Sequence, residues 1–231
     1  GGDCLNTGCV PSKAIIKSAK VAQQMRQAEK YGLQNTTPQF SFKKVMARVQ
    51  QVVADIAPHD SVERYTNLGV EVIKGYAKLI DPWTVEIKLN DGGTQTLTAR
   101  TIVIATGARP FVPPLPGIEE TGYVTSDTLW TKFAELEEAP KKLVVLGGGP
   151  IGSELAQSFA RLGSNVTQIE MAERIMIKED LEVSTFAHEA LTESGVNILT
   201  SHQALRCEAR DGKKFIVVKH NDTEIDIEYD E

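Results

Sequence analysis

The 231-residue chain has few cysteines and no long apolar run. Three cysteines are too few for a secreted domain held together by disulfides, so a reducing, cytoplasmic setting is the expectation. The longest aliphatic runs, such as LVVL at residues 143–146, fall far short of the roughly 20 residues that a membrane span needs. We therefore expect no membrane segment in this stretch of sequence.

Basic charge is also scarce, because 25 Lys and Arg stand against 31 Asp and Glu, for a net charge of −6. No basic cluster is visible, which argues against general nucleic-acid binding and against binding to anionic membranes. A structural zinc site needs about four ligands, and the pair Cys4 and Cys9 supplies only two, so we expect no metal site. The four histidines are each expected at the surface or in turns: His59, His188, His202 and His220.

The composition is that of an ordinary globular protein, with 41% hydrophobic and 24% charged residues. Apolar residues at three- and four-residue spacing predict a helix from Pro11 to about Glu29. A second helix is expected from near Ser41, with Val45, Val49, Val52 and Ile56 on one stripe and Pro58 at its end.

Between residues 70 and 105 the pattern changes to short runs typical of strands: VEVI, WTVEIKL, TQTLTA and TIVIA. The sequence NDGG at 90–93 predicts a hairpin turn. The proline-rich stretch ARPFVPPLPGIEE at 108–120 is interpreted as a linker.

A second unit follows, in which residues 141–170 predict a strand, a glycine turn, a helix stopped by Gly163, and another strand. A further helix is expected at 181–194, then the strand GVNIL, and then two strands joined at RDGKK. The last residues, EIDIEYDE, are strand-like.

Gly147, Gly149 and Gly152 fit the GxGxxG pattern, in which missing side chains let the backbone turn tightly, approach a pyrophosphate and pack helix on strand. Glu170 lies 18 residues after Gly152, where a carboxylate can accept hydrogen bonds from an adenine ribose. An acid there disfavours the 2′-phosphate of NADP, so NAD is expected, although Arg174 works against that preference. The alternative is a glycine-rich turn in another kind of α/β protein.

Cys9 is expected just before the Pro11 helix, where free amide groups and the positive end of the helix dipole stabilise a thiolate. Lys13 follows four residues later and adds positive charge near the sulfur. The pair Cys4 and Cys9 is therefore either redox-active or two inert thiols at a helix start. Cys207 is interpreted as a packing residue.

The segment GGDCLNTGCVPSKA resembles the redox-active disulfide segment of the flavin-dependent pyridine nucleotide-disulfide oxidoreductases, whose usual form is GGTCxNxGCxPSK. That family includes dihydrolipoamide dehydrogenase, glutathione reductase and mercuric reductase. TIVIATGARP is similar to its strand-ATG segment, and GGGPIGSELAQSFARLGSNVTQIE to its nicotinamide-binding unit. The sequences ELAQSFARLGSNVT and GYVTSDTLW look most like those of mercuric reductases.

The resemblance implies an α/β fold with a partial FAD-binding Rossmann-like domain at 1–115, which carries the disulfide helix. An NAD(P)-binding Rossmann-like domain follows at 116–231, with three layers, a parallel sheet and a β-meander. It also implies that the chain is a piece of a longer protein that forms a homodimer. The piece alone is expected to bind FAD poorly and to be inactive.

The resemblance further implies roles for single residues. Cys9 would lie beside the flavin, and Cys4 would be the interchange thiol that meets the substrate. Lys13 would lie near the flavin ring as a buried lysine paired with Glu154. The implied cofactor-binding residues are Gly2, Lys13, Ala77, Ala105, Thr106 and Gly107 for FAD, and Gly147, Gly149, Gly152 and Glu170 for NAD.

The implied activity is transfer of electrons from NADH through FAD to a Cys4–Cys9 disulfide and on to a disulfide or thiophilic substrate. Lipoamide, a glutathione-like disulfide and Hg(II) all stay open as that substrate. The alternative is a dinucleotide-binding module without catalysis, or a thiol sensor. One departure from the motif is Asp3, which replaces the usual threonine and is expected to change flavin affinity and the disulfide potential.

Overall fold

The computed structural model describes residues 2–231. It opens with helix α1 (Asp3–Asn6), which is followed by α2 (Cys9–Arg26) and the short 3-10 helix η1 (Ala28–Tyr31). The predicted helix is confirmed, but it begins two residues before Pro11 and so includes Cys9. The helix can begin before Pro11 because proline is accepted throughout the first turn of a helix. A proline therefore marks the start of a helix only to within a few residues.

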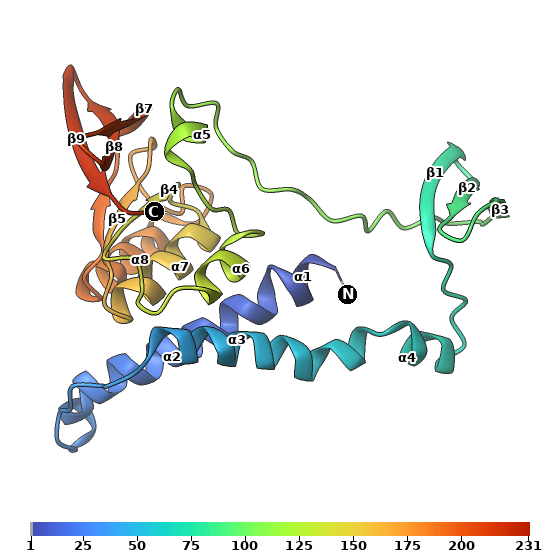
Figure 1. The fold of residues 1–231 in the computed structure, drawn as a ribbon, viewed down its shortest axis with the longest axis horizontal. Coiled ribbons are helices and arrows are strands. Elements are labelled where there is room, and N and C mark those ends of the chain that lie inside the picture. The colour runs from blue at the N-terminus through green and yellow to red at the C-terminus, as the bar shows by residue number, and fades with distance from the viewer. Residues whose placement is uncertain (1) are drawn as a thin grey trace.

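Helix α3 (Phe42–Ile56) packs alongside α2 and runs back in the opposite direction (Figure 1). The hydroxyl of Ser41 caps it by accepting a hydrogen bond from the Lys44 amide. The helix ends just before Pro58, as predicted, and gives way to η2 (Ala57–Asp60) and α4 (Val62–Asn67). Of the predicted apolar stripe, Val49 is fully buried.

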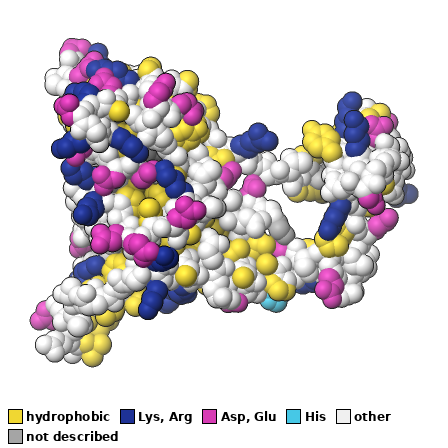
Figure 2. Space-filling model, in the orientation of Figure 1, with side chains coloured by type: hydrophobic (Ala, Val, Ile, Leu, Met, Phe, Trp, Pro, Cys, Tyr) yellow, Lys and Arg dark blue, Asp and Glu magenta, His cyan; other side chains and the backbone are white. Residues whose placement is uncertain are grey.

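An antiparallel sheet follows, with β2 (Thr84–Leu89) between β1 (Gly75–Asp81) and β3 (Thr94–Thr98). The hairpin turn at 90–93 is confirmed by the pairing of β2 with β3. The run VEVI at 70–73 is not a strand, so that expectation was wrong. This sheet stands apart from the main body in Figure 1, and Figure 2 shows hydrophobic side chains on its surface.

Residues 99–117 form no strand or helix, so the expectation of a strand at TIVIA was also wrong. The segment is extended and crosses between the two parts of the molecule in Figure 1. Val103 and Phe111 are 82% and 85% exposed. A β-type sequence becomes a strand only where another strand completes its hydrogen-bond ladder, and none lies beside this one among the described residues.

The second unit is the predicted strand–helix–strand unit. A parallel sheet is formed by β4 (Lys142–Leu146), β5 (Asn165–Ile169) and β6 (Asn197–Leu199), in that order. Helix α7 (Pro150–Arg161) connects β4 to β5, and α8 (Leu181–Glu193) connects β5 to β6. Two short helices precede the sheet: α5 (Ile118–Thr121) and α6 (Leu129–Ala134).

A second antiparallel sheet contains β7 (Gln203–Arg210), β8 (Lys213–His220) and β9 (Thr223–Tyr229). Val166 of β5 packs into the core on the α7 side, while Ile169 packs against the antiparallel sheet. Side chains therefore alternate between the two faces, and the unit has three layers. The parallel sheet within an α/β fold is thus present, as predicted.

Two of the histidines are not isolated at the surface. His202 and His220 are half-buried and stack with ring centroids 4.4 Å apart. Nothing in the sequence pattern indicates this contact, because the pairing of β7 with β8 brings together residues 18 positions apart.

One core joins the beginning and the end of the chain. Ile15 of α2 and Met46 of α3 lie in the same buried cluster as Phe159 and Val166 of the second unit. The domain boundary near residue 115 stays a prediction. Residues from both sides of it contribute to this one core. Among residues 2–231, no helix is long and apolar enough to cross a membrane.

Candidate active site

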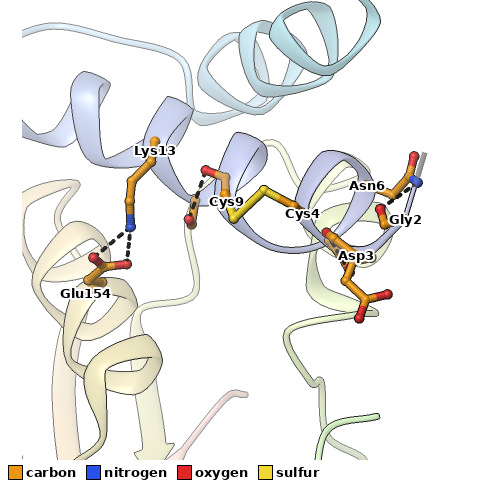
Figure 3. The surroundings of a disulfide bond; sticks show 9 residues. Gly2, Asp3, Cys4, Asn6, Cys9, Lys13 and Glu154 are labelled. Atoms are coloured by element: carbon orange, nitrogen blue, oxygen red, sulfur yellow. Dashed lines mark hydrogen bonds and ion pairs between the residues drawn. A yellow bond between two sulfur atoms is a disulfide. The ribbon is translucent and has the colours of Figure 1, made fainter. Parts of the chain in front are cut away.

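The two N-terminal cysteines form a disulfide that is exposed on the surface (Figure 3). Cys4 lies in α1 and Cys9 is the first residue of α2, with their Cα atoms 4.6 Å apart. A side chain at Gly8 would place its Cβ 3.1 Å from the Asp3 carbonyl, so glycine allows the two helices to meet. Exposed sulfurs at the start of an 18-residue helix are accessible to thiol–disulfide exchange, and the dipole of α2 favours a thiolate on Cys9.

One turn further along α2, the ammonium group of Lys13 contacts both carboxylate oxygens of Glu154 in α7, at 2.7 and 2.6 Å (Figure 3). The resemblance implied this pair, and it connects the disulfide helix to the second unit. The expectation that the lysine is buried was wrong, because the two side chains are 59% and 40% exposed. Helix α2 also packs on α7, and Ile15 and Ala19 of α2 are buried in the core that the two helices share.

Asp3 holds the segment around Gly107 and Ala108 against α1. Its carboxylate accepts a hydrogen bond of 3.1 Å from the Ala108 amide. Gly107 has a φ of +73°, and a Cβ there would lie 2.5 Å from the Asp3 carboxylate. Of the residues proposed to approach FAD, Gly107 is therefore brought to the helix that carries Cys4, and Ala105 and Thr106 directly precede it in the chain.

Besides Lys13, two further residues were proposed for FAD, Gly2 and Ala77, and they have different positions. Gly2 precedes α1 and its carbonyl accepts hydrogen bonds from the backbone and side chain of Asn6. Ala77 lies on β1, in the sheet that stands apart from the disulfide in Figure 1. The structure therefore does not bring Ala77 together with the cysteines.

The glycine turn has the conformation that its sequence predicts. Gly147 has a φ of +104°, and a Cβ at Gly152 would lie 2.7 Å from the Gly147 carbonyl. Gly149 faces open space, since a Cβ there would meet no atom within 4 Å. The turn thus fits a dinucleotide phosphate, with the backbone accessible at Gly149 and the first turn of α7 directed towards it.

Glu170 directly follows β5, the second strand of this unit. Its two carboxylate oxygens accept hydrogen bonds from the amides of Gly148, at 2.6 Å, and Ala172, at 2.7 Å. The guanidinium of Arg174 donates instead to the carbonyls of its own loop, at Met176, Ile177 and Glu179. Gly148 is a functional position that the sequence reasoning missed, because a glycine is also needed there to admit the Glu170 carboxylate.

A largely apolar cavity of about 440 Å³ adjoins the glycine turn. Its walls come from the segment around Phe111 and Val112, from β4, and from Gly147 and Gly149 themselves. An apolar hollow beside a phosphate-binding turn is a common setting for a small-molecule site.

A second missed position is Trp130. Its indole N–H donates a hydrogen bond of 2.8 Å to the carbonyl of Thr7, which lies in the loop between the two cysteines. The signal available in the sequence was general: a buried tryptophan needs a partner for its N–H group.

Comparison with known proteins agrees with this geometry. The sequence profile described as pyridine nucleotide-disulphide oxidoreductase matches residues 1–230. A mercuric reductase of Streptomyces lividans is 37% identical over 221 residues, which are 94% of this chain and 44% of that protein. A dihydrolipoyl dehydrogenase of Zymomonas mobilis is 37% identical over 202 residues, which are 87% of this chain and 42% of that protein.

Among solved structures, the Cu(II) complex of the HOCl-induced flavoprotein disulfide reductase RclA from Escherichia coli superposes with a TM-score of 0.74 and 27% identity. The match covers 100% of this chain and 46% of that one. The chain thus spans less than half the length of the relatives that it matches. The exposed disulfide, the glycine turn and a profile match over almost every residue agree: the chain belongs to the pyridine nucleotide-disulphide oxidoreductase family.

Proposed function

We propose that the full protein is an FAD-dependent oxidoreductase that passes electrons from NADH to the Cys4–Cys9 disulfide and on to a disulfide or thiophilic substrate. The observation that carries this proposal is the exposed Cys4–Cys9 disulfide at the start of α2, connected through the Lys13–Glu154 pair to the helix that follows the glycine turn. One NADH and one proton reduce one disulfide to two thiols, with NAD⁺ as the other product.

Three residues on one side of α2 and α7 support the proposal. Cys9 is positioned so that its thiolate is stabilised by the helix dipole and by the ammonium group of Lys13. Glu154 holds that ammonium group in place. FAD, when bound, would supply a ring that accepts a hydride from the nicotinamide and releases two electrons to a disulfide.

Gly147, Gly149 and Gly152 would hold the nucleotide phosphates, and Glu170 would accept hydrogen bonds from the ribose. NADH is the proposed coenzyme because the Glu170 carboxylate is anchored at the turn, while Arg174 is engaged by three carbonyls of its own loop. An anchored carboxylate repels the 2′-phosphate of NADPH.

The thiophilic substrates to compare are Hg(II), lipoamide and glutathione disulfide. The similarity to mercuric reductases and dihydrolipoyl dehydrogenases supports testing Hg(II) and lipoamide first. Assembly as a homodimer is part of the same proposal for the full protein.

The electron path is tested on the full natural protein loaded with FAD, without oxygen. One equivalent of NADH should produce about two new thiols per chain, counted with a chromogenic disulfide reagent. Cys4→Ser and Cys9→Ser should produce none. NADH binding without new thiols in the natural protein would favour the alternative, a dinucleotide-binding module or a thiol sensor.

The glycine turn is tested with Gly149→Ala. The backbone at Gly149 has a φ of −74° and no atom lies near the added methyl, so we expect an unchanged fold. The methyl would project where the phosphates approach, and NADH affinity should fall at least about fivefold, in line with the roughly 1–3 kcal/mol that overpacking costs. Thr192→Ala on the exposed end of α8 is the matched control, and equal NADH affinity in both variants would contradict the assignment.

A further inference from the structure

Trp130 in α6 reaches the loop that joins the two cysteines. Its side chain is 97% buried in the core shared by α2, α3 and α7, since only 3% of it is exposed. Its single N–H group donates to the carbonyl of Thr7, at 2.8 Å. Thr7 lies between Cys4 and Cys9, so a buried group from a distant part of the chain is bonded to the disulfide ring itself.

The Thr7 carbonyl lies between the two helices, so it takes no part in the hydrogen-bond ladder of either one. Thr7 follows the last residue of α1. The first carbonyl that accepts a bond within α2 is that of Gly8, from the Ser12 amide. The indole of Trp130 supplies a donor to the Thr7 carbonyl from outside both helices.

We infer that Trp130 is a positioning residue that holds the Cys4–Cys9 loop in one shape and so sets how easily the disulfide is reduced. When the disulfide opens, an unrestrained loop would let the two sulfurs separate. A loop fixed at Thr7 keeps them close and favours re-formation of the bond. The inference rests on the proposed redox role of the cysteine pair.

The test is the equilibrium of the full natural protein with glutathione. Two glutathione molecules reduce the Cys4–Cys9 disulfide, the S–S bond breaks, two protein thiols form, and glutathione disulfide is the other product. Trapping the thiols at a series of glutathione ratios gives the equilibrium constant without any need for FAD or NADH.

Trp130→Phe removes the N–H group and keeps an aromatic ring in the core. Without this bond the reduced loop gains freedom, whereas the oxidised loop is still closed by its S–S bond. The equilibrium should therefore shift about fivefold towards the dithiol, which is about 20 mV in this two-electron couple. An equilibrium constant within about twofold of the natural one would overturn the inference.

Phe133→Leu is the matched control in the same helix. Phe133 is buried like Trp130, but its ring has no N–H group that could donate to the loop. It should lower stability and leave the glutathione equilibrium unchanged. An equal shift in both variants would show that Trp130 acts only through core stability, and would also overturn the inference.

A measurement on the unchanged sequence covers the case in which Trp130→Phe fails to fold. The indole N–H of Trp130 should exchange with solvent much more slowly than that of Trp83, which is 61% exposed, in both the oxidised and the reduced protein. Fast exchange of Trp130 in either state would overturn the inference. The outcome is separate from the proposed function, which fails only if NADH does not reduce the disulfide.

Discussion

Lys13 and Glu154 make two short contacts, yet water still reaches both side chains. Exposed ion pairs contribute little to stability, because the charges are screened and two long side chains lose freedom. The value of this pair therefore lies in placing a positive charge one helical turn from Cys9. The role that we propose for it is electrostatic, near the Cys9 sulfur.

The first prediction follows from that exposure. In a double-mutant cycle of Lys13→Gln and Glu154→Gln, the coupling free energy of unfolding should be below about 1 kcal/mol, measured by urea denaturation. A coupling above about 2 kcal/mol would instead indicate a pair shielded from water, as the sequence had led us to expect.

Asp3 departs from the usual cysteine motif and takes part in a contact with a distant segment. The sequence indicated only that a carboxylate beside the first cysteine adds negative charge. The structure adds a partner, the amide of Ala108, and a reason for glycine at 107. Its expected effect on flavin affinity and disulfide potential stays a prediction.

At the scale of elements, the antiparallel sheet of β7, β8 and β9 contains Cys207 on β7 and Tyr229 on β9. Both side chains are buried, and Cys207 is a packing residue as predicted. Burial raises the pKa of Tyr229 to about 12, and the nearby Cys207 contributes in the same direction. The folded protein therefore holds this phenol neutral above pH 10, where an exposed tyrosine ionises.

The second prediction gives the sign of the pH dependence. A group whose folded pKa is raised contributes stability that is present below its unfolded pKa and is lost as the pH rises to the folded value. The free energy of unfolding should thus fall more steeply between pH 10 and 12 in the natural chain than in Tyr229→Phe. Chemical denaturation across that range checks this, and parallel curves for the two proteins would contradict it.

At the scale of the whole molecule, a core shared by both ends of the chain contrasts with an exposed linking segment at 99–117. Ile15 and Met46 pack with Phe159 although more than 100 residues separate them. The segment 99–117 that links the hairpin sheet to the second unit contains no helix or strand and exposes apolar side chains such as Val103 and Ile104. Stability should therefore differ strongly between the core and this segment.

The third prediction is that limited proteolysis of the 231-residue chain cuts this segment first. Trypsin should cleave after Arg100, and thermolysin near Val103, because exposed extended backbone fits a protease cleft. The two pieces should still elute together on gel filtration, since α2 and α3 belong to the core of the second unit. First cuts within β4, α7 or β5, or pieces that separate after cleavage, would contradict the description of a shared core.

Much of this protein could be predicted from its sequence alone, because the determining interactions are local. The glycine pattern at 147–152 fixes a tight turn, because Gly147 has a positive φ that other residues avoid and Gly152 has no room for a Cβ. Apolar spacing fixes α2, α3, α7 and α8, and NDGG and RDGK fix two hairpins. The cysteine motif indicated a redox pair because its chemistry lies within six residues and a helix start.

Only the tertiary structure decided the rest. It left TIVIA without a strand partner, left Lys13 in water, placed Asp3 on the Ala108 amide and brought Trp130 to the Thr7 carbonyl. Each of these outcomes depends on groups up to 141 residues apart in the chain. Spacing and propensity describe what one segment favours, whereas burial and hydrogen-bond partners depend on which other segment packs against it.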